Sequence, residues 1–314
     1  MRDAFVRALM REAAADPNLV LITGDLGFGV LKPFWETYPK QFVNAGIAEQ
    51  SMTGLAAGLA RAGKTVLTYS IGNFPTLRCL EQIRNDCAYH GANVKIVCVG
   101  GGFVYGSLGM SHHATEDMAI LRALPGVTVF TPGDPAETEA VVPVMLQTPG
   151  TCYLRLGRGG ERTLHSQPID AWSMPKALCL RDGSDIALLS AGGILSQTVD
   201  AAEKLQAEGI SAAVWSFPCI KPIDKAAVLA LAGRYRTLVT VEEHTIIGGF
   251  GSAVAEILAE AGSPARLRRV GMNDTYACEV GSQDHLRKVY QMDAEAIARR
   301  AAQWKAEEKN KWNS

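Results

Sequence analysis

The stretch GIAEQ (residues 46–50), with the small-residue run from Ser51 to Gly63 behind it, is the most informative part of this 314-residue chain. A short extended segment (42–44) precedes it, and the run rich in alanine and glycine that follows predicts a closely packed helix. Glu49 stands in the first turn of that helix, where the helix dipole favours a carboxylate. A buried carboxyl, however, tends to keep its proton and can then donate a hydrogen bond. Both a structural and a chemical role are therefore open for Glu49.

Outward from this stretch, short apolar runs alternate with segments of helical periodicity. This alternation is typical of α/β units on a mostly parallel sheet. We expect two three-layer α/β/α domains, at residues 1–160 and 181–314, joined by a polar, irregular linker at 161–180. The predicted strands are Val20–Thr23, Thr65–Tyr69, Val94–Val99, Val127–Thr131, Thr151–Leu156, Ile186–Ser190, Ala212–Ser216, Thr237–Val241 and Leu267–Val270.

The composition excludes several classes of protein. The chain has 31 basic and 32 acidic residues, without the basic and aromatic clusters that bind nucleic acid or the cationic amphipathic stretches that bind membranes. No long apolar segment occurs in the sequence, and we expect no signal peptide. The seven cysteines lack the spacing of a zinc site or a disulfide framework, so we expect reduced thiols, no metal ligands on this chain and a cytoplasmic location.

Glycine-rich turns follow three of the predicted strands, at residues 24–29, 100–102 and 192–193. None of them has the G-x-G-x-x-G spacing or the residues of a P-loop, so nucleotide binding is not supported. Because open α/β sheets place ligands at the carboxyl ends of their strands, the turns can nevertheless line a ligand site. Asp25, in the first of them, is either a turn residue or part of such a site.

A set of motifs, taken in order, resembles the pyrimidine-binding domain of transketolase, and the end of the chain resembles that enzyme's C-terminal domain. The resemblance covers most of the chain and is more specific for the family than for its substrate. The matching segments are LITGDL (21–26), GIAEQSMTGLAAGLARAGK (46–64), NF (73–74), EQIR (81–84), GMSHHATED (109–117), LRALPGVTVFTPGDPAET (121–138) and EEHTIIGGFGSAVAE (242–256).

The resemblance implies a site for thiamine diphosphate. Glu49 would be the catalytic acid at N1′ of the aminopyrimidine, Phe74 would stack on that ring, and Asp25 would line the cofactor region. Without the resemblance, Phe74 is better explained as a core residue. His112 would act in catalysis and contact oxygen atoms of the donor sugar, while His113 would orient His112 or contact substrate.

The resemblance also implies that half of the site lies elsewhere. Thiamine diphosphate enzymes hold Mg²⁺ and the diphosphate with a Gly-Asp-Gly motif, which in transketolase belongs to an N-terminal domain, and no such motif occurs in this sequence. We therefore expect a partner, an N-terminal transketolase subunit with that motif. The partner would hold Mg²⁺, and the cofactor would lie across the interface of a heterotetramer. The cofactor would carry the carbanion chemistry, and protein groups would position and protonate.

The implied reaction is the transfer of a two-carbon ketol unit between sugar phosphates or related anionic ketoses. Arg2 and Arg158 match family positions that hold the anionic end of the sugar, and arginine forks suit phosphate or sulfonate oxygens. Four positions depart from conventional transketolase, which has a serine, an aromatic residue, a histidine and an aspartate where this chain has Gly29, Ile71, Gly100 and Leu108. We hypothesise that a substrate differs from the standard pentose phosphates, for example a branched or sulfonated ketose.

Two alternatives stay open. The β-subunit of a 2-oxoacid dehydrogenase has a similar length, a cofactor-proximal glutamate and a loop histidine, although the motifs lie closer to transketolase. A non-catalytic assembly subunit is the second alternative, and the presence of Glu49, Phe74 and His112 together argues against it. We expect the C-terminal domain to support assembly, with EEHTIIGGFG (242–251) as a strand–helix junction rather than a second active site.

Overall fold

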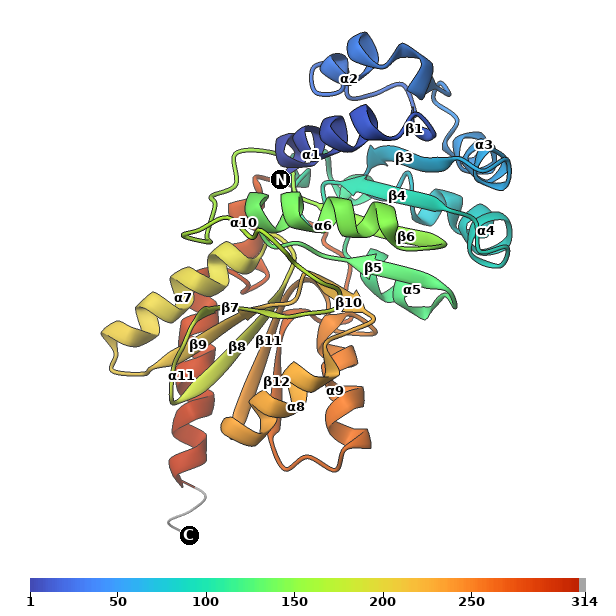
Figure 1. Cartoon of the computed structure of the whole chain (residues 1–314). Helices are drawn as coiled ribbons and strands as arrows, with labels where there is room; N and C mark the ends of the chain where they lie inside the picture. Colours follow the sequence, from blue (N-terminus) through green and yellow to red (C-terminus); the bar gives the residue numbers. More distant parts are fainter. Residues whose placement is uncertain (311–314) are drawn as a thin grey trace.

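The computed structural model describes residues 1–310, with side chains as far as Glu307. The chain forms a seven-stranded and a five-stranded sheet, each with helices on both faces (Figure 1). The seven-stranded sheet lies in the upper part of the view and the five-stranded sheet in the lower part. This arrangement confirms the predicted fold class of three-layer α/β/α units with mostly parallel sheets.

The first sheet has the strand order β10-β5-β6-β4-β3-β1-β2, and its neighbouring strands are parallel except for β10 against β5. Helices α1 and α6 bury residues such as Phe5 and Val141 on one face, and α3 buries Met52 on the other. The strands are β1 (Leu19–Thr23), β2 (Phe42–Asn44), β3 (Thr65–Ile71), β4 (Val94–Val99), β5 (Val127–Phe130), β6 (Thr151–Leu156) and β10 (Cys219–Lys221). The helices are α1 (Arg2–Ala15), α2 (Lys32–Thr37), α3 (Glu49–Arg61), α4 (Leu80–Gln82), α5 (Asp117–Ala123) and α6 (Pro135–Gln147).

The second sheet has the order β12-β11-β8-β9-β7 and is parallel except for β7 against β9. Its strands are β7 (Leu178–Arg181), β8 (Ile186–Ala191), β9 (Ala212–Ser216), β11 (Thr237–Thr245) and β12 (Arg266–Met272). The helices are α7 (Leu195–Ala207), α8 (Lys225–Arg234), α9 (Phe250–Glu260), α10 (Gln283–Val289) and α11 (Ala294–Asn310). Leu205 of α7 and Ile297 of α11 bury one face, and Val254 of α9 the other.

The nine predicted strands are present, and two short strands, β7 and β10, were not predicted. β7 begins at Leu178, so the irregular segment ends before the predicted end of the linker. β10 has only three residues, too few for a sequence periodicity, and it pairs antiparallel with β5. The second half of the chain therefore supplies an edge strand to the first sheet.

The parallel strands β1, β3, β4 and β6 end at one edge of the first sheet. The loops after these strands begin at Gly24, Gly72, Gly100 and Gly157, and together with the start of α3 they bring the predicted site residues to that edge. This is where open α/β sheets place ligands.

The described residues include no helix that is both long and apolar enough to cross a bilayer. All seven cysteines carry free thiols, and five of them are buried. Burial raises the pKa of the Cys87 and Cys98 thiols to about 12, so both stay protonated at neutral pH.

Candidate active site

Glu49 opens α3 and is only 4% exposed. The turn before it requires Gly46, whose φ of 72° lies in the left-handed region. Gly24 packs beside it, since a Cβ added there would lie 3.4 Å from Glu49 Cγ. Glu49 Oε2 accepts a hydrogen bond from Arg78 Nη1 at 2.8 Å. The Arg78 guanidinium is thus a direct partner of the Glu49 side chain.

A continuous row of side chains leads from Glu49 to His112. The Arg78 guanidinium carbon lies 4.5 Å from the centroid of the Phe74 ring, in a cation–π contact. The Phe74 ring then meets the His112 imidazole edge to face, with centroids 5.0 Å apart. The structure thus brings together the three residues that the sequence singled out, and it adds Arg78, which the sequence analysis missed. No motif marked Arg78, whose position depends on how the chain turns after β3.

His112 ends a 3-10 turn (Met110–His112) in the loop between β4 and α5. Its Nδ1 lies 3.0 Å from Ser111 Oγ. Burial, with the neighbouring His113 as the second cause, lowers the pKa of His112. The imidazole is therefore neutral at pH 7, and it can either donate or accept a hydrogen bond to a sugar oxygen.

The side chain of His113 is buried within the loop. Its side chain is 2% exposed, its Nε2 lies 3.2 Å from the carbonyl oxygen of Gly106, and its ring meets Phe103 edge to face. These contacts let His113 shape the loop, and its expected roles, orienting His112 or contacting substrate, stay predictions.

Asp25 lies in the turn after β1 with a φ of 58°, a conformation that Asp and Asn tolerate better than most residues. Its Oδ1 accepts a hydrogen bond from Asn44 Nδ2 at 2.9 Å, and its backbone N–H donates to Asn44 Oδ1 at 3.1 Å. The same Asn44 oxygen accepts from the N–H of Gly46 at 3.0 Å. Asp25 thus ties the turn after β1 to the turn before Glu49.

Arg2 and Arg158 come together at the other end of the row. The Arg158 guanidinium carbon lies 5.5 Å from the centroid of the Tyr105 ring, and Arg2 Nη2 would lie 3.6 Å from a Cβ at Gly159. Burial raises the pKa of Tyr105, and the charges of Arg158 and Arg2 partly oppose that shift. Both predicted anion-binding residues therefore surround one phenol.

Tyr105 was not predicted, and it occupies the space next to Gly100. A Cβ at Gly100 would lie 2.2 Å from Tyr105 Cδ2, so any side chain there would displace the ring. The centroid of the same ring lies 6.4 Å from that of His112. Tyr105 therefore connects His112 with the two arginines. The glycine at position 100 was the only sequence signal that could have pointed to it.

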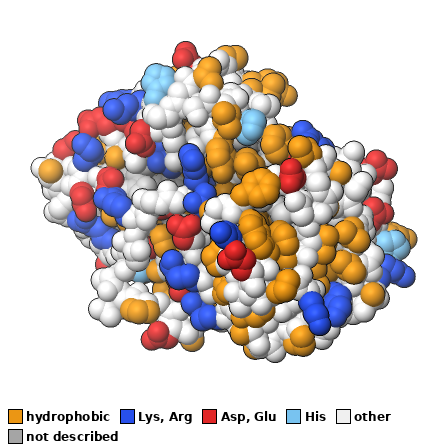
Figure 2. Space-filling view, turned by 90° about the horizontal axis from the view of Figure 1, so that it is seen from above, with side chains coloured by type: hydrophobic (Ala, Val, Ile, Leu, Met, Phe, Trp, Pro, Cys, Tyr) orange, Lys and Arg blue, Asp and Glu red, His pale blue; other side chains and the backbone are white. Residues whose placement is uncertain are grey.

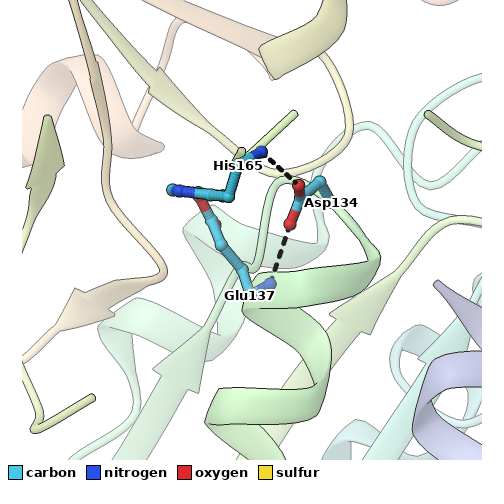
Figure 3. Close-up of side chains that lie close together, drawn as sticks. All are labelled: Asp134, Glu137 and His165. Carbon is cyan, nitrogen blue, oxygen red and sulfur yellow. Dashed lines mark hydrogen bonds and ion pairs between the residues drawn. The ribbon is translucent and has the colours of Figure 1, made fainter. Parts of the chain in front are cut away.

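One cluster outside this row contains residue types that bind metals: Asp134, Glu137 and His165, shown in Figure 3. Its carboxylate oxygens are already engaged. Asp134 accepts from the N–H groups of Glu137, Leu164 and His165, and Glu137 accepts from the Gly133 N–H and the Ser216 hydroxyl. Burial alone would lower the pKa of His165, but its 2.9 Å contact with Glu137 outweighs burial and leaves the pKa raised. The cluster therefore caps α6 and fixes the segment after β6.

A buried glutamate, an aromatic ring and a histidine thus meet at the carboxyl ends of the strands of a parallel α/β sheet, as the resemblance to thiamine diphosphate enzymes implied. Comparison with known families agrees with this class. The chain belongs to the transketolase family, whose pyrimidine binding domain matches residues 1–162 and whose C-terminal domain matches residues 175–297. The chain is a transketolase subunit.

Two curated relatives span nearly the whole chain. The 6-deoxy-6-sulfo-D-fructose transketolase subunit SqwH of a Clostridium species is 37% identical over 96% of this chain and 93% of its own length. A subunit of the apulose-4-phosphate transketolase of Phocaeicola vulgatus is 35% identical over 96% of each chain. A solved structure described as a split gene transketolase, inactive beta4 tetramer, is 35% identical with a TM-score of 0.86 and covers 95% of both chains.

Membership of this family implies dependence on thiamine diphosphate. The residues present fit the pyrimidine end of that cofactor. Among the described residues, the buried Glu49 carboxyl has one hydrogen-bond partner, Arg78, and Phe74 offers a half-buried aromatic face beside it.

Proposed function

We propose that this chain is the C-terminal subunit of a transketolase that moves a two-carbon ketol unit from an anionic ketose to an aldose. The observation that carries the proposal is the row formed by Glu49, Arg78, Phe74 and His112. Four side chains from three separate segments converge there, and three of them, Glu49, Phe74 and His112, have a role in the proposed reaction.

The site residues of this chain have the following roles in the proposal. Glu49 exchanges a proton at the aminopyrimidine nitrogen, and Phe74 stacks on the same ring. His112, neutral at pH 7, forms hydrogen bonds to sugar oxygens. Arg2 and Arg158 bind the anionic end of the sugar, and Asp25 supports the turn beside Glu49. When it is bound, thiamine diphosphate supplies the nucleophilic carbon and the electron sink.

We further propose that a partner subunit with a Gly-Asp-Gly motif holds Mg²⁺ and the diphosphate, in a heterotetramer. The sequence of this chain lacks that motif. The split transketolase structure that resembles it is described as an inactive beta4 tetramer, which supports a need for a second kind of subunit. Seven free thiols support our proposal of the cytoplasm as the compartment.

An apolar surface supports the proposed assembly. Figure 2 shows apolar side chains gathered across the face at the top of Figure 1, where α2 lies. Phe28, in the turn after β1, is 60% exposed, and Ile47, in the turn before α3, is 79% exposed. A contiguous exposed apolar patch marks an interaction surface, whereas apolar residues exposed singly are common on any protein.

We propose that the sugar differs from the standard pentose phosphates. Leu108 is 54% exposed in the His112 loop, where conventional transketolase has an aspartate, and Tyr105 fills the space next to Gly100. An apolar group and a phenol thus occupy the places where conventional transketolase has an aspartate, which reads a substrate hydroxyl, and a histidine. The names of two relatives include a sulfonated and a branched-chain sugar, which supports a sugar of one of these kinds.

The test is a steady-state assay of the chain combined with its Gly-Asp-Gly partner. We expect aldehyde release from a sulfonated or branched ketose with a higher kcat/KM than from xylulose 5-phosphate. A wide preference for xylulose 5-phosphate and ribose 5-phosphate would refute the substrate proposal. Release of CO₂ from a 2-oxoacid would refute the transketolase proposal itself and favour a 2-oxoacid dehydrogenase.

A further inference from the structure

The loop that presents His112 has little structure of its own. It runs from Gly100 to Glu116 between β4 and α5 and contains only two single 3-10 turns. Its two stems are joined by one isolated bridge, in which the backbones of Gly102 and Ala114 exchange hydrogen bonds of 2.8 and 3.0 Å. A loop of this length needs further anchors to hold a side chain in place.

Glu243, on β11 of the second sheet, provides the strongest of these anchors. It is 2% exposed, and its Oε1 accepts from the backbone N–H of Phe103, in the first stem of the loop, at 2.6 Å. Gln283 Nε2 donates to the same oxygen at 2.9 Å, and Arg287 Nε donates to Oε2 at 2.5 Å. A buried carboxylate with this set of donors is held rigidly.

The backbone packs directly against this carboxylate. Gly102 has a φ of 68°, and a Cβ added there would lie 2.4 Å from Glu243 Oε1. Next to it, the Phe103 ring stacks on Tyr290 with centroids 5.3 Å apart. The first stem is therefore fixed to the second half of the chain by a hydrogen bond, a close approach and a ring contact.

The second stem of the loop is fixed to the same strand. The N–H of Thr245 donates to the carbonyl oxygen of Thr115 at 2.8 Å. Arg155 Nη2 donates to the carbonyl oxygens of both Ala114 and Glu243, at 2.8 and 3.0 Å. Both stems are thus fixed to β11, at Glu243 and at Thr245.

We propose that Glu243 is a positioning residue for His112, and that the second half of the chain acts on the reaction by fixing this loop. The segment EEHTIIGGFG (242–251), which contains Glu243, then supports the site in addition to joining a strand to a helix. The effect of this loop on turnover rests on the proposed function. The anchoring of the loop by Glu243 is independent of that function.

The test compares the Glu243→Gln variant of the full chain with the wild type. Gln keeps the size but places an amide against the Arg287 and Gln283 donors, so we expect the loop to detach. Backbone amides of residues 104–112 should exchange with solvent at least about tenfold faster, while amides of β1 and β3 stay unchanged. The NMR titration midpoint of His112 should rise toward about 6.5, because a detached loop loses the burial that lowers its pKa.

A second readout uses the enzyme assembled with its partner. A displacement of about 1 Å at the reacting groups costs about 100-fold, so kcat should fall strongly in Glu243→Gln while cofactor affinity changes little. The control is Glu260→Gln, which removes a carboxylate that pairs with Lys225 on the same half, far from the loop. It should change none of these readouts.

If Glu243→Gln fails to fold, Gln283→Ala replaces it, since it removes donors to Glu243 but keeps the carboxylate. It should shift exchange and titration in the same direction by a smaller amount. Unchanged loop exchange and an unchanged His112 titration in a folded variant would overturn the inference. If both readouts respond but the assembled enzyme transfers no ketol unit, the anchoring of the loop stands and the proposed function fails.

Discussion

Glu49 and Glu243 are both nearly fully buried glutamates of the same chain, yet their surroundings differ. Glu49 has one hydrogen-bond donor, the guanidinium of Arg78, whose side chain is 47% exposed. Glu243 accepts from a backbone N–H, an amide and a buried guanidinium. A buried carboxylate with all its donors supplied by the protein holds structure together. One with a single replaceable donor can take a ligand.

The largest expected effect comes from Glu49→Gln. The amide keeps the shape but cannot exchange a proton at a ring nitrogen, so turnover of the assembled enzyme should fall by about 10³-fold. Thermal unfolding of the chain should be nearly unchanged. Turnover close to that of the wild type would remove the distinction between the two glutamates and favour the non-catalytic assembly subunit.

The second effect is on the free energy of unfolding, where replacing Glu243 should cost more than replacing Glu49. Glu243→Ala leaves Arg287, with only 7% of its side chain exposed, without its main partner, so the free energy of unfolding should fall by about 3–5 kcal/mol. Glu49→Ala leaves a half-exposed Arg78 that water can solvate, so its effect should stay within about 1 kcal/mol. Urea unfolding of both variants measures the difference, and equal losses would contradict it.

The third prediction concerns His244, which follows Glu243 on β11. Burial lowers the pKa of His244 to about 4, so the unfolded chain binds a proton near pH 6.5 that the folded chain refuses. Its contribution to stability is therefore lost as the pH falls from 6.5 through 4, by up to about 3 kcal/mol.

The neighbouring Glu242 titrates in the opposite sense, since burial raises its pKa to about 7. His244→Gln separates the two effects. The stability difference between wild type and His244→Gln, from urea unfolding, should shrink as the pH falls from 6.5 to 4. A difference that does not depend on pH would show that His244 has the same pKa in the folded and the unfolded chain.

The smallest effect is expected at Phe74. Phe74→Leu removes the ring face that contacts His112 and Arg78, and a stacking contact is worth about 1 kcal/mol. The cofactor concentration that gives half-maximal activity should rise by about five- to tenfold, with kcat less affected. An unchanged cofactor requirement would return Phe74 to the core role that its sequence position first suggested.

The sequence predicted nine strands of the two sheets from their patterning, and the resemblance to transketolase implied that Glu49, Phe74 and His112 share one site. It did not predict Arg78 or Tyr105. Their positions depend on the path of irregular loops, which carries no periodicity. The role of Glu243 depends on how the two halves of the chain pack, and no local pattern records that.

The heat of binding when thiamine diphosphate and Mg²⁺ are titrated into this chain mixed with its Gly-Asp-Gly partner tests the central claim most directly. We expect saturable binding by the mixture and by neither protein alone, with weaker binding when this chain carries Glu49→Gln. Absence of binding by the mixture, or equally tight binding by the partner alone, would contradict a cofactor site shared with Glu49.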